Sequence, residues 1–148
     1  MRQLRVAALA LLASIVLLVP AHADFFKEAT TLTVAPAVIE PNTDFTMTLS
    51  GVDPGAWNML LISTMQGTGM IGGVELGVQP PYLLTFIGLS GLTGQITINK
   101  HIESVPPELW GQAFAVQGLS LKVLMGPMGL TVNFYTSNVE TFSFYNPI

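Results

Sequence analysis

The chain has 148 residues, of which 50% are hydrophobic and 9% are charged, and it contains no cysteine. Its five basic residues are too few for the basic patch that nucleic acids or anionic lipid surfaces require, so we expect neither partner. Soluble domains usually contain about 25% charged residues. A surface this poor in charge must be built from Thr, Ser, Asn and Gln side chains. We expect such a surface either to associate with a partner or to form the polar exterior of a β-protein.

Residues 1–23 have the pattern of a secretory signal peptide. Two arginines precede an apolar run of 14 residues, and Ala21-His22-Ala23 is a small-x-small cleavage site. The run is shorter than the roughly 20 residues that a membrane-spanning helix needs. The sequence therefore predicts cleavage after Ala23 and a secreted or periplasmic protein whose mature chain does not insert into a membrane.

The remaining segment, 24–148, has the length of a single domain. It holds three basic and nine acidic residues, which gives a net charge of 3 − 9 = −6. A signal peptide leads to an oxidising compartment, yet this chain cannot form a disulfide. A bacterial exported protein fits these features better than a small eukaryotic secreted one.

The first half of this domain alternates between apolar runs and turn residues. Leu32–Ala35 alternates with threonines, and Pro36 ends this strand or limits it to an edge. In residues 44–50 every second residue is apolar, which predicts a half-buried strand with Phe45, Met47 and Leu49 facing inward. Residues 57–62 are apolar on both faces, which predicts a central strand.

Residues 66–77 contain five glycines, and we interpret them as a flexible inter-strand loop. The letters Gly67-Thr68-Gly69-Met70-Ile71-Gly72 match a dinucleotide-binding fingerprint, but no helical pattern follows them. The Gly-Lys-Ser/Thr ending of a phosphate-binding loop is also absent. We therefore expect no nucleotide cofactor.

The second half continues the same pattern, and nothing in it repeats with a helical period. Turn residues such as Gly126-Pro127 separate the apolar runs, and we interpret residues 100–103 as a polar connection between strands. Seven to nine short strands with turns at these intervals are typical of an immunoglobulin-like, antiparallel β-sandwich, which is the all-β fold that we predict. The predicted strands of this half are 82–87, 92–99, 109–117, 119–125, 130–135 and 141–145.

One stretch resembles a group of known proteins. Leu109-x-Gly111-x-x-Phe114-x-Val116-Gln117, followed by Leu130 and Ser137-Asn138-Val139, is similar to small secreted β-sandwich proteins of environmental bacteria. These proteins have an immunoglobulin-like look and no characterised activity, and here Gly118 stands where they have Ala. The resemblance implies a fold and an export route, and it brings no catalytic residues. It implies structural roles: turns at Gly111 and Ser137-Asn138, and a loop tied by Gln117.

No arrangement of residues predicts catalysis. His101 is the single histidine of the mature segment, no G-x-S-x-G elbow accompanies a serine, and we expect a solvated side chain in a turn. Several carboxylates could be considered for calcium binding or glycoside hydrolysis, but their spacing fits neither. They are Glu40, Asp44, Asp53, Glu103 and Glu108. We expect no catalytic residue, no metal and no cofactor.

These observations favour a non-enzymatic module with a structural, adhesion or envelope-interaction role. It would pair an edge strand, such as Leu32–Ala35 or Val139–Tyr145, with another protein or with a second copy. The alternative is a carbohydrate- or small-ligand-binding domain in which Trp57 and Trp110 expose aromatic faces. The competing interpretation of these tryptophans is core packing and loop anchoring, since large aromatic side chains are mostly buried. An enzyme built around His101 is a third, less favoured hypothesis.

Overall fold

The computed structural model describes residues 30–148, so the predicted signal peptide and cleavage site lie outside the described residues. Within this range the chain is all-β, with ten strands and one short 3-10 helix, Pro107–Leu109. No helix of the described range is long and apolar enough to cross a membrane. The strands are β1 (Thr31–Ala35), β2 (Val38–Ile39), β3 (Thr43–Ser50), β4 (Trp57–Ser63), β5 (Gln66–Ile71), β6 (Val74–Val78), β7 (Leu83–Leu89), β8 (Gln95–Ile102), β9 (Ala113–Gly126) and β10 (Gly129–Phe144).

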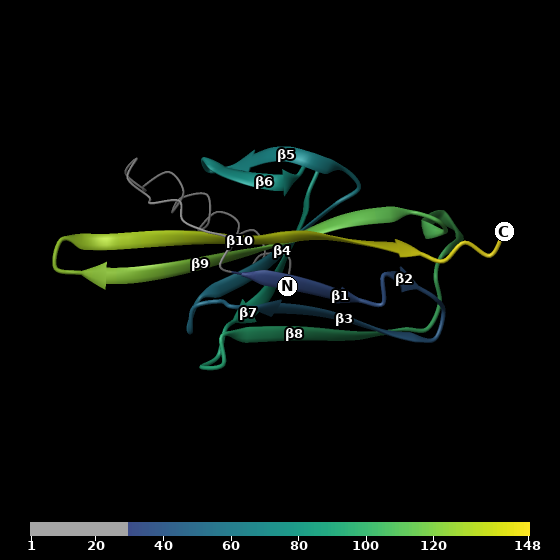
Figure 1. Cartoon of the computed structure of the whole chain (residues 1–148), viewed down its shortest axis with the longest axis horizontal. Coiled ribbons are helices and arrows are strands. Elements are labelled where there is room, and N and C mark those ends of the chain that lie inside the picture. Colours follow the sequence, from purple (N-terminus) through teal and green to yellow (C-terminus); the bar gives the residue numbers. More distant parts are fainter. Residues whose placement is uncertain (1–29) are drawn as a thin grey trace, which may run out of the picture.

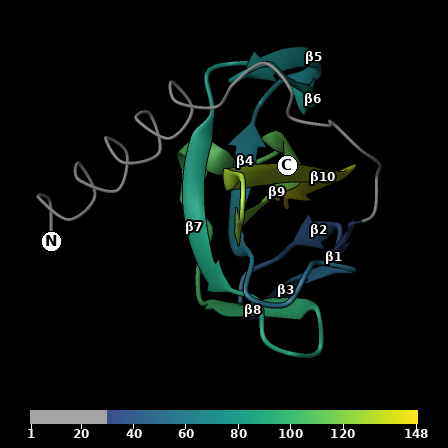
Figure 2. The ribbon, with the colours of Figure 1, turned by 90° about the vertical axis from the view of Figure 1, so that its left-hand side faces the viewer.

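The strands form three sheets that stack as layers (Figure 1). The large sheet has the order β2-β10-β9-β4-β7, the small sheet has the order β1-β3-β8, and β5 and β6 form a hairpin. The large sheet is the middle layer, with the small sheet on one face and the hairpin on the other (Figure 2). All strand pairs are antiparallel except β2 with β10, so the predicted purely antiparallel arrangement is wrong at this edge.

The core between the small and large sheets follows the predicted alternation in β3. Phe45, Met47 and Leu49 are buried, as expected, because side chains of a strand point alternately to opposite faces. They pack against residues of the large sheet that include Val116 and Phe142, and the rings of Phe45 and Phe142 lie 5.1 Å apart. Phe142, from the predicted strand 141–145, is therefore part of this core.

The prediction of a central strand at 57–62 is confirmed by β4, which lies between β9 and β7. Leu60 belongs to the core shared with the small sheet, whereas Met59 and Leu61 belong to a second core beneath the hairpin. Both faces of β4 are apolar because the large sheet is covered on both faces.

The glycine-rich segment is a hairpin, and the expectation of a flexible loop is wrong. Gly72 and Gly73 have φ angles of 56° and 85° and join the paired residues Ile71 and Val74. Two central residues with positive φ are what a type I′ hairpin turn requires, and glycine adopts them without strain. Side chains from β6 then complete the second core: Val74, Leu76 and Val78.

The predicted strands 109–117 and 119–125 join as one strand of 14 residues, β9, which begins at Ala113. The predicted start is wrong, because Leu109 ends the 3-10 helix and residues 110–111 form a turn. Gly118 does not break this strand. Its lack of a side chain makes room for Leu49 of the small sheet. The predicted strands 130–135 and 141–145 likewise join as β10, which has 16 residues. The turn at Gly126-Pro127 is confirmed. Because β9 pairs with β4 only as far as Leu121, residues 122–133 extend beyond the sheet as a two-stranded arm (Figure 1).

Of the two predicted edge strands, one is confirmed and the other is confirmed in part. Leu32–Ala35 lies in β1, at an end of the small sheet. Residues 139–144 belong to β10, which β2 flanks only at Ser143 and Phe144, so 139–142 has no strand partner on that side. The chain leaves the small sheet at Pro36 and adds β2 to the large one. The side chain of Asn138 also joins the two sheets, because its Oδ1 accepts from the Leu32 N–H (2.7 Å) and its Nδ2 donates to the Leu32 carbonyl (3.1 Å).

Candidate interaction surface

An apolar patch is left uncovered on the hairpin side of the large sheet. Trp57 lies two residues before Met59 and four before Leu61, so its side chain points to the same face as theirs. On β7, Phe86 pairs with Met59 and Leu89 pairs with Trp57, which puts both on this face. The hairpin covers Met59 and Leu61 but leaves Trp57, Phe86 and Leu89 exposed by 48%, 54% and 55%. We call these three exposed residues the apolar patch.

Two aromatic rings form the centre of the apolar patch. The rings of Trp57 and Phe86 have centroids 5.4 Å apart and an interplanar angle of 41°. Tilted pairs at this separation attract one another, so each ring restrains the other in a fixed position. The exposure that the alternative ligand-binding hypothesis requires is therefore present at Trp57, and the interpretation of this tryptophan as a core residue is wrong.

Strand β7 borders the apolar patch and is the last strand of the large sheet (Figure 2). None of its seven residues is buried, and Leu83 is 63% exposed. The strand contains no charged residue and no proline. Its apolar composition indicates a strand but does not distinguish a buried position from an edge, so β7 was not among the predicted interaction sites. The absence of charge from 82–89 was the available signal.

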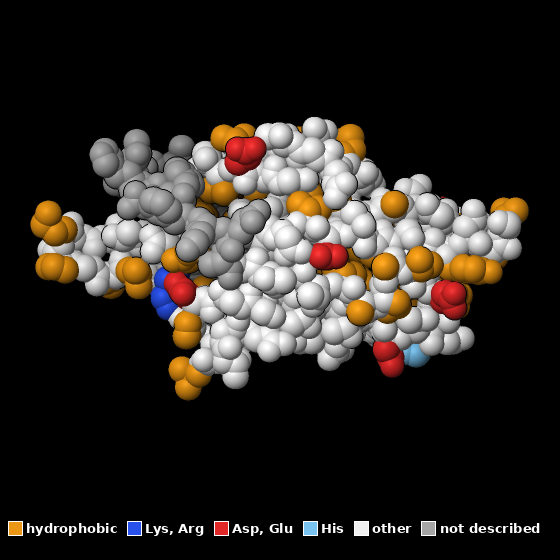
Figure 3. Space-filling model, in the orientation of Figure 1, with side chains coloured by type: hydrophobic (Ala, Val, Ile, Leu, Met, Phe, Trp, Pro, Cys, Tyr) orange, Lys and Arg blue, Asp and Glu red, His pale blue; other side chains and the backbone are white. Residues whose placement is uncertain are grey.

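A second exposed apolar region lies at the end of the arm, where Figure 3 shows hydrophobic side chains. Met125 and Leu130 are paired, and by alternation from Leu121 they share the face of the apolar patch. Leu124 and Met128 complete the region, and Met128 is fully exposed. Methionine side chains are flexible and polarizable, so this tip can adapt to apolar surfaces of different shapes.

Trp110 does not join Trp57 in one binding platform. It follows the 3-10 helix, is 39% exposed, and donates from Nε1 to the carbonyl of Val105 over 3.0 Å. Trp57 pairs with Leu121, whereas Trp110 precedes the opposite end of β9 at Ala113. Leu121 lies eight residues after Ala113, a distance of about 26 Å in an extended strand.

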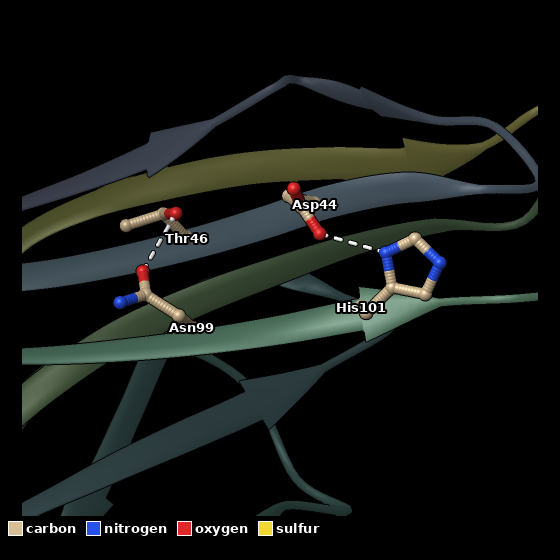
Figure 4. A network of polar contacts seen from close by, with 4 residues as sticks. All are labelled: Asp44, Thr46, Asn99 and His101. Carbon is tan, nitrogen blue, oxygen red and sulfur yellow. Dashed lines mark hydrogen bonds and ion pairs between the residues drawn. The ribbon is translucent and has the colours of Figure 1, made fainter.

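His101 lies in β8, so its prediction as part of a polar connection is wrong, while its predicted solvation is confirmed. Its Nδ1 lies 2.7 Å from Oδ1 of Asp44, and these side chains are 53% and 84% exposed (Figure 4). Thr46 donates to Asn99 over 2.9 Å in the neighbouring cross-strand pair (Figure 4). Within 30–148, no serine or threonine hydroxyl hydrogen-bonds to His101. The group is a polar ladder on the outer face of the small sheet.

The carboxylates do not assemble into a site. No group of three or more His, Asp or Glu residues within 30–148 could hold a metal ion, and Glu103 and Glu108 are exposed. The absence of a bound metal stays a prediction. Asp53 instead lies near Tyr135, where burial raises the pKa of the phenol and the carboxylate of Asp53 raises it further. The Tyr135 side chain is therefore neutral at physiological pH.

The residues that carry the family resemblance have structural roles. Gln117 accepts from the Gly77 N–H over 2.9 Å and donates to the Ser137 carbonyl over 2.8 Å, which ties the hairpin to β10. Ser137 and Asn138 lie at a register shift in β10, and Gly111 has a φ of 70° in the turn after the 3-10 helix. The structural roles predicted for these residues are confirmed, although Ser137-Asn138 forms a bulge within a strand and not a turn.

No family model and no curated protein matches the chain. Among solved structures it is similar to the Pseudomonas fluorescens alkylpurine DNA glycosylase AlkC bound to DNA containing an abasic site analog, with 15% sequence identity and a TM-score of 0.39. The similarity covers 80% of this chain but 31% of that chain. At this level neither the fold nor the activity of the glycosylase carries over to this protein.

Proposed function

We propose that this protein is an exported, non-catalytic β-sandwich that binds another macromolecule through the apolar patch. The observation that carries the proposal is the Trp57–Phe86 pair, which is half-exposed beside an edge strand. Exposed apolar patches with a polar rim mark contact sites in soluble proteins. Large aromatic side chains also provide much of the binding energy at such sites.

The order of the strands supports an immunoglobulin-like sandwich. The small sheet, β1-β3-β8, fits strands A, B and E of that fold, and β10-β9-β4-β7 fits strands G, F, C and C′ of its variable type. The hairpin β5–β6 is then an insertion between C and C′. The chain lacks the disulfide and the buried strand-C tryptophan of antibody domains, since it has no cysteine and Trp57 points outward.

The side chains on the outer face of the small sheet favour a binding role for this protein over a catalytic one. Its side chains hydrogen-bond to one another across the strands, as in the pairs His101–Asp44 and Thr46–Asn99. His101 and Asp44 are both surrounded by water. Acid–base catalysis instead uses groups within hydrogen-bonding reach of a bound substrate. The apolar patch offers no acid, base or nucleophile, but it offers area for a contact.

Site-specific photo-cross-linking tests the proposal. A photoreactive phenylalanine analogue replaces Trp57 in the full-length chain expressed in bacterial cells, and His101 receives the same change as a matched, exposed control. We expect cross-linked adducts from position 57 and none from position 101. Equal adduct formation at the two positions, or none at either, would contradict binding through the apolar patch.

The exposed Trp57 also favours a second candidate, a carbohydrate-binding site in which the indole stacks on a sugar face. The chain has two tryptophans, so a Trp110→Phe variant reports the fluorescence of Trp57 alone. Titration with polysaccharides leaves this emission unchanged if the apolar patch binds protein. A saturable shift of the emission would favour the carbohydrate-binding hypothesis.

A further inference from the structure

We infer that β7 pairs antiparallel with the β7 strand of a second copy of this chain, around a two-fold axis through Thr85. The two large sheets then form one continuous sheet, with Phe86 of each apolar patch next to the axis and Trp57 and Leu89 farther from it. This inference rests on the proposed function and names the partner as a second copy.

The edges of the two larger sheets are not equally protected. Natural proteins block edge strands with charge, proline or extreme shortness, because an open edge pairs with other chains. β8 carries Lys100 and His101, and on β1 the N–H and carbonyl of Leu32 are already bound by the side chain of Asn138, which covers that edge. β2 has two residues and lies between Pro36 and Pro41. β7 has seven residues and no charge, so it is the open end strand of these two sheets.

The geometry of β7 fixes the position of the two-fold axis. Leu83 to Phe86 pair regularly with β4, and a register shift follows between Phe86 and Gly88. An axis through Thr85 keeps the contacts in the regular part, with Thr85 opposite its own copy and Leu84 opposite Phe86 of the second copy. These residues pair on matching faces because opposed residues of antiparallel strands share a face. Thr–Thr and aromatic–aliphatic cross-strand pairs are both favourable.

The absence of charge on β7 permits this pairing, and the small contact area limits the stability of the dimer. No charged residue lies between Leu83 and Leu89, so two copies can approach without opposing like charges. Leu83, Leu84 and Phe86 lie beside the axis and are 63%, 36% and 54% exposed, which leaves on the order of 100 Å² of surface per side chain. Two copies would bury about 600 Å² of apolar side-chain surface plus backbone, which is less than the roughly 1,000 Å² of a stable specific interface. We therefore expect a reversible, concentration-dependent dimer.

Sedimentation equilibrium of the purified protein tests the pairing. Thr85→Lys places two lysines opposite each other at the axis, and Thr33→Lys makes the same change at an exposed position of the β1 edge. We expect Thr85→Lys to raise the dimer dissociation constant at least about ten-fold, which corresponds to about 1.4 kcal/mol, and Thr33→Lys to leave it unchanged. A wild-type chain that stays monomeric at millimolar concentration overturns the inference, and so does a dimer that is insensitive to Thr85→Lys.

Cysteine trapping provides a second test that does not depend on the lysine variant. The chain contains no cysteine, so any disulfide comes from the introduced residue. Under mild oxidation Thr85→Cys forms a covalent dimer, because opposed residues of antiparallel strands have Cβ atoms about 5 Å apart, whereas Thr33→Cys stays monomeric. Equal cross-linking of both variants overturns the inference.

The photo-cross-linking experiment separates the two proposals. Adducts of position 57 with a second copy support both proposals. Adducts with a different protein, together with a monomeric purified chain, support the proposed function and overturn the inference. The absence of any adduct contradicts the proposed function itself.

Discussion

The outer face of the small sheet and the hairpin side of the large sheet differ in the side chains that they expose to solvent. On the small sheet, threonine, asparagine, aspartate and histidine side chains hydrogen-bond across β3 and β8, so a surface with little charge is still polar (Figure 4). On the large sheet, the hairpin covers part of an apolar face and leaves Trp57, Phe86 and Leu89 in solvent. The comparison shows that low overall charge has two different consequences in one domain: a hydrated polar ladder and an uncovered contact surface.

The largest expected effect is a difference in the free energy of unfolding between a residue that the hairpin covers and a residue that it leaves exposed. Leu61 is fully buried beneath the hairpin, so Leu61→Ala should lower the free energy of unfolding by about 2–5 kcal/mol. Phe86→Ala on the same face should cost about 1 kcal/mol or less, because the ring is half-exposed. Urea unfolding, monitored at concentrations where the chain is monomeric, measures both. Equal losses would mean that Phe86 is covered within one copy.

A smaller effect is expected where the two sheets are joined. Asn138→Ala removes both hydrogen bonds to the Leu32 backbone and should lower the free energy of unfolding by about 1–3 kcal/mol. Asn99→Ala makes the same change in the exposed polar ladder and should cost less than about 1 kcal/mol, because water replaces the lost contact. Chemical denaturation of the two variants side by side measures the difference. A greater loss for Asn99→Ala would contradict the structural role of Asn138.

The smallest effect is expected from the ion pair of the polar ladder. Asp44→Asn should change the free energy of unfolding by less than about 1 kcal/mol, because the pair with His101 is exposed and screened by salt. The same variant should leave self-association unchanged, since β8 is not the pairing edge. Thermal melts at low and high salt, with sedimentation as the second readout, check both points. Loss of the dimer in Asp44→Asn would move the interface to the small sheet.

Local patterns in the sequence were sufficient to predict the strands whose burial follows from their own alternation or composition. Phe45, Met47 and Leu49 alternate with polar residues, and 57–62 is apolar on both faces, so their positions follow from period and composition. The hairpin at 66–78 was missed because glycine-rich composition fits a loop as well as a type I′ turn. Gly118 was read as a break because the approach of Leu49 from the other sheet has no local signal.

The candidate site was predicted in part, for a similar reason. The exposure of Trp57 was among the sequence hypotheses, but its pairing with Phe86 depends on the neighbouring positions of β4 and β7. Whether a strand lies at an edge depends on sheet order, which local patterns do not specify. The same limit led to Val139–Tyr145 being named as an edge although β2 covers part of it. Proline and charge within a strand indicate a protected edge, but 31–35 and 82–89 both lack them, so the sequence alone does not separate the covered edge of β1 from the open edge of β7.

Backbone hydrogen exchange measured over a range of protein concentrations is the most direct test of the contrast between the two faces. If β7 pairs with a second copy, its outward-facing amides gain protection as the concentration rises through the dissociation constant, while the amides of β8 and β1 exchange at unchanged rates. Exchange in β7 that is independent of concentration, or protection that appears in β8 instead, would contradict the assignment of the open edge and the apolar patch as the contact surface.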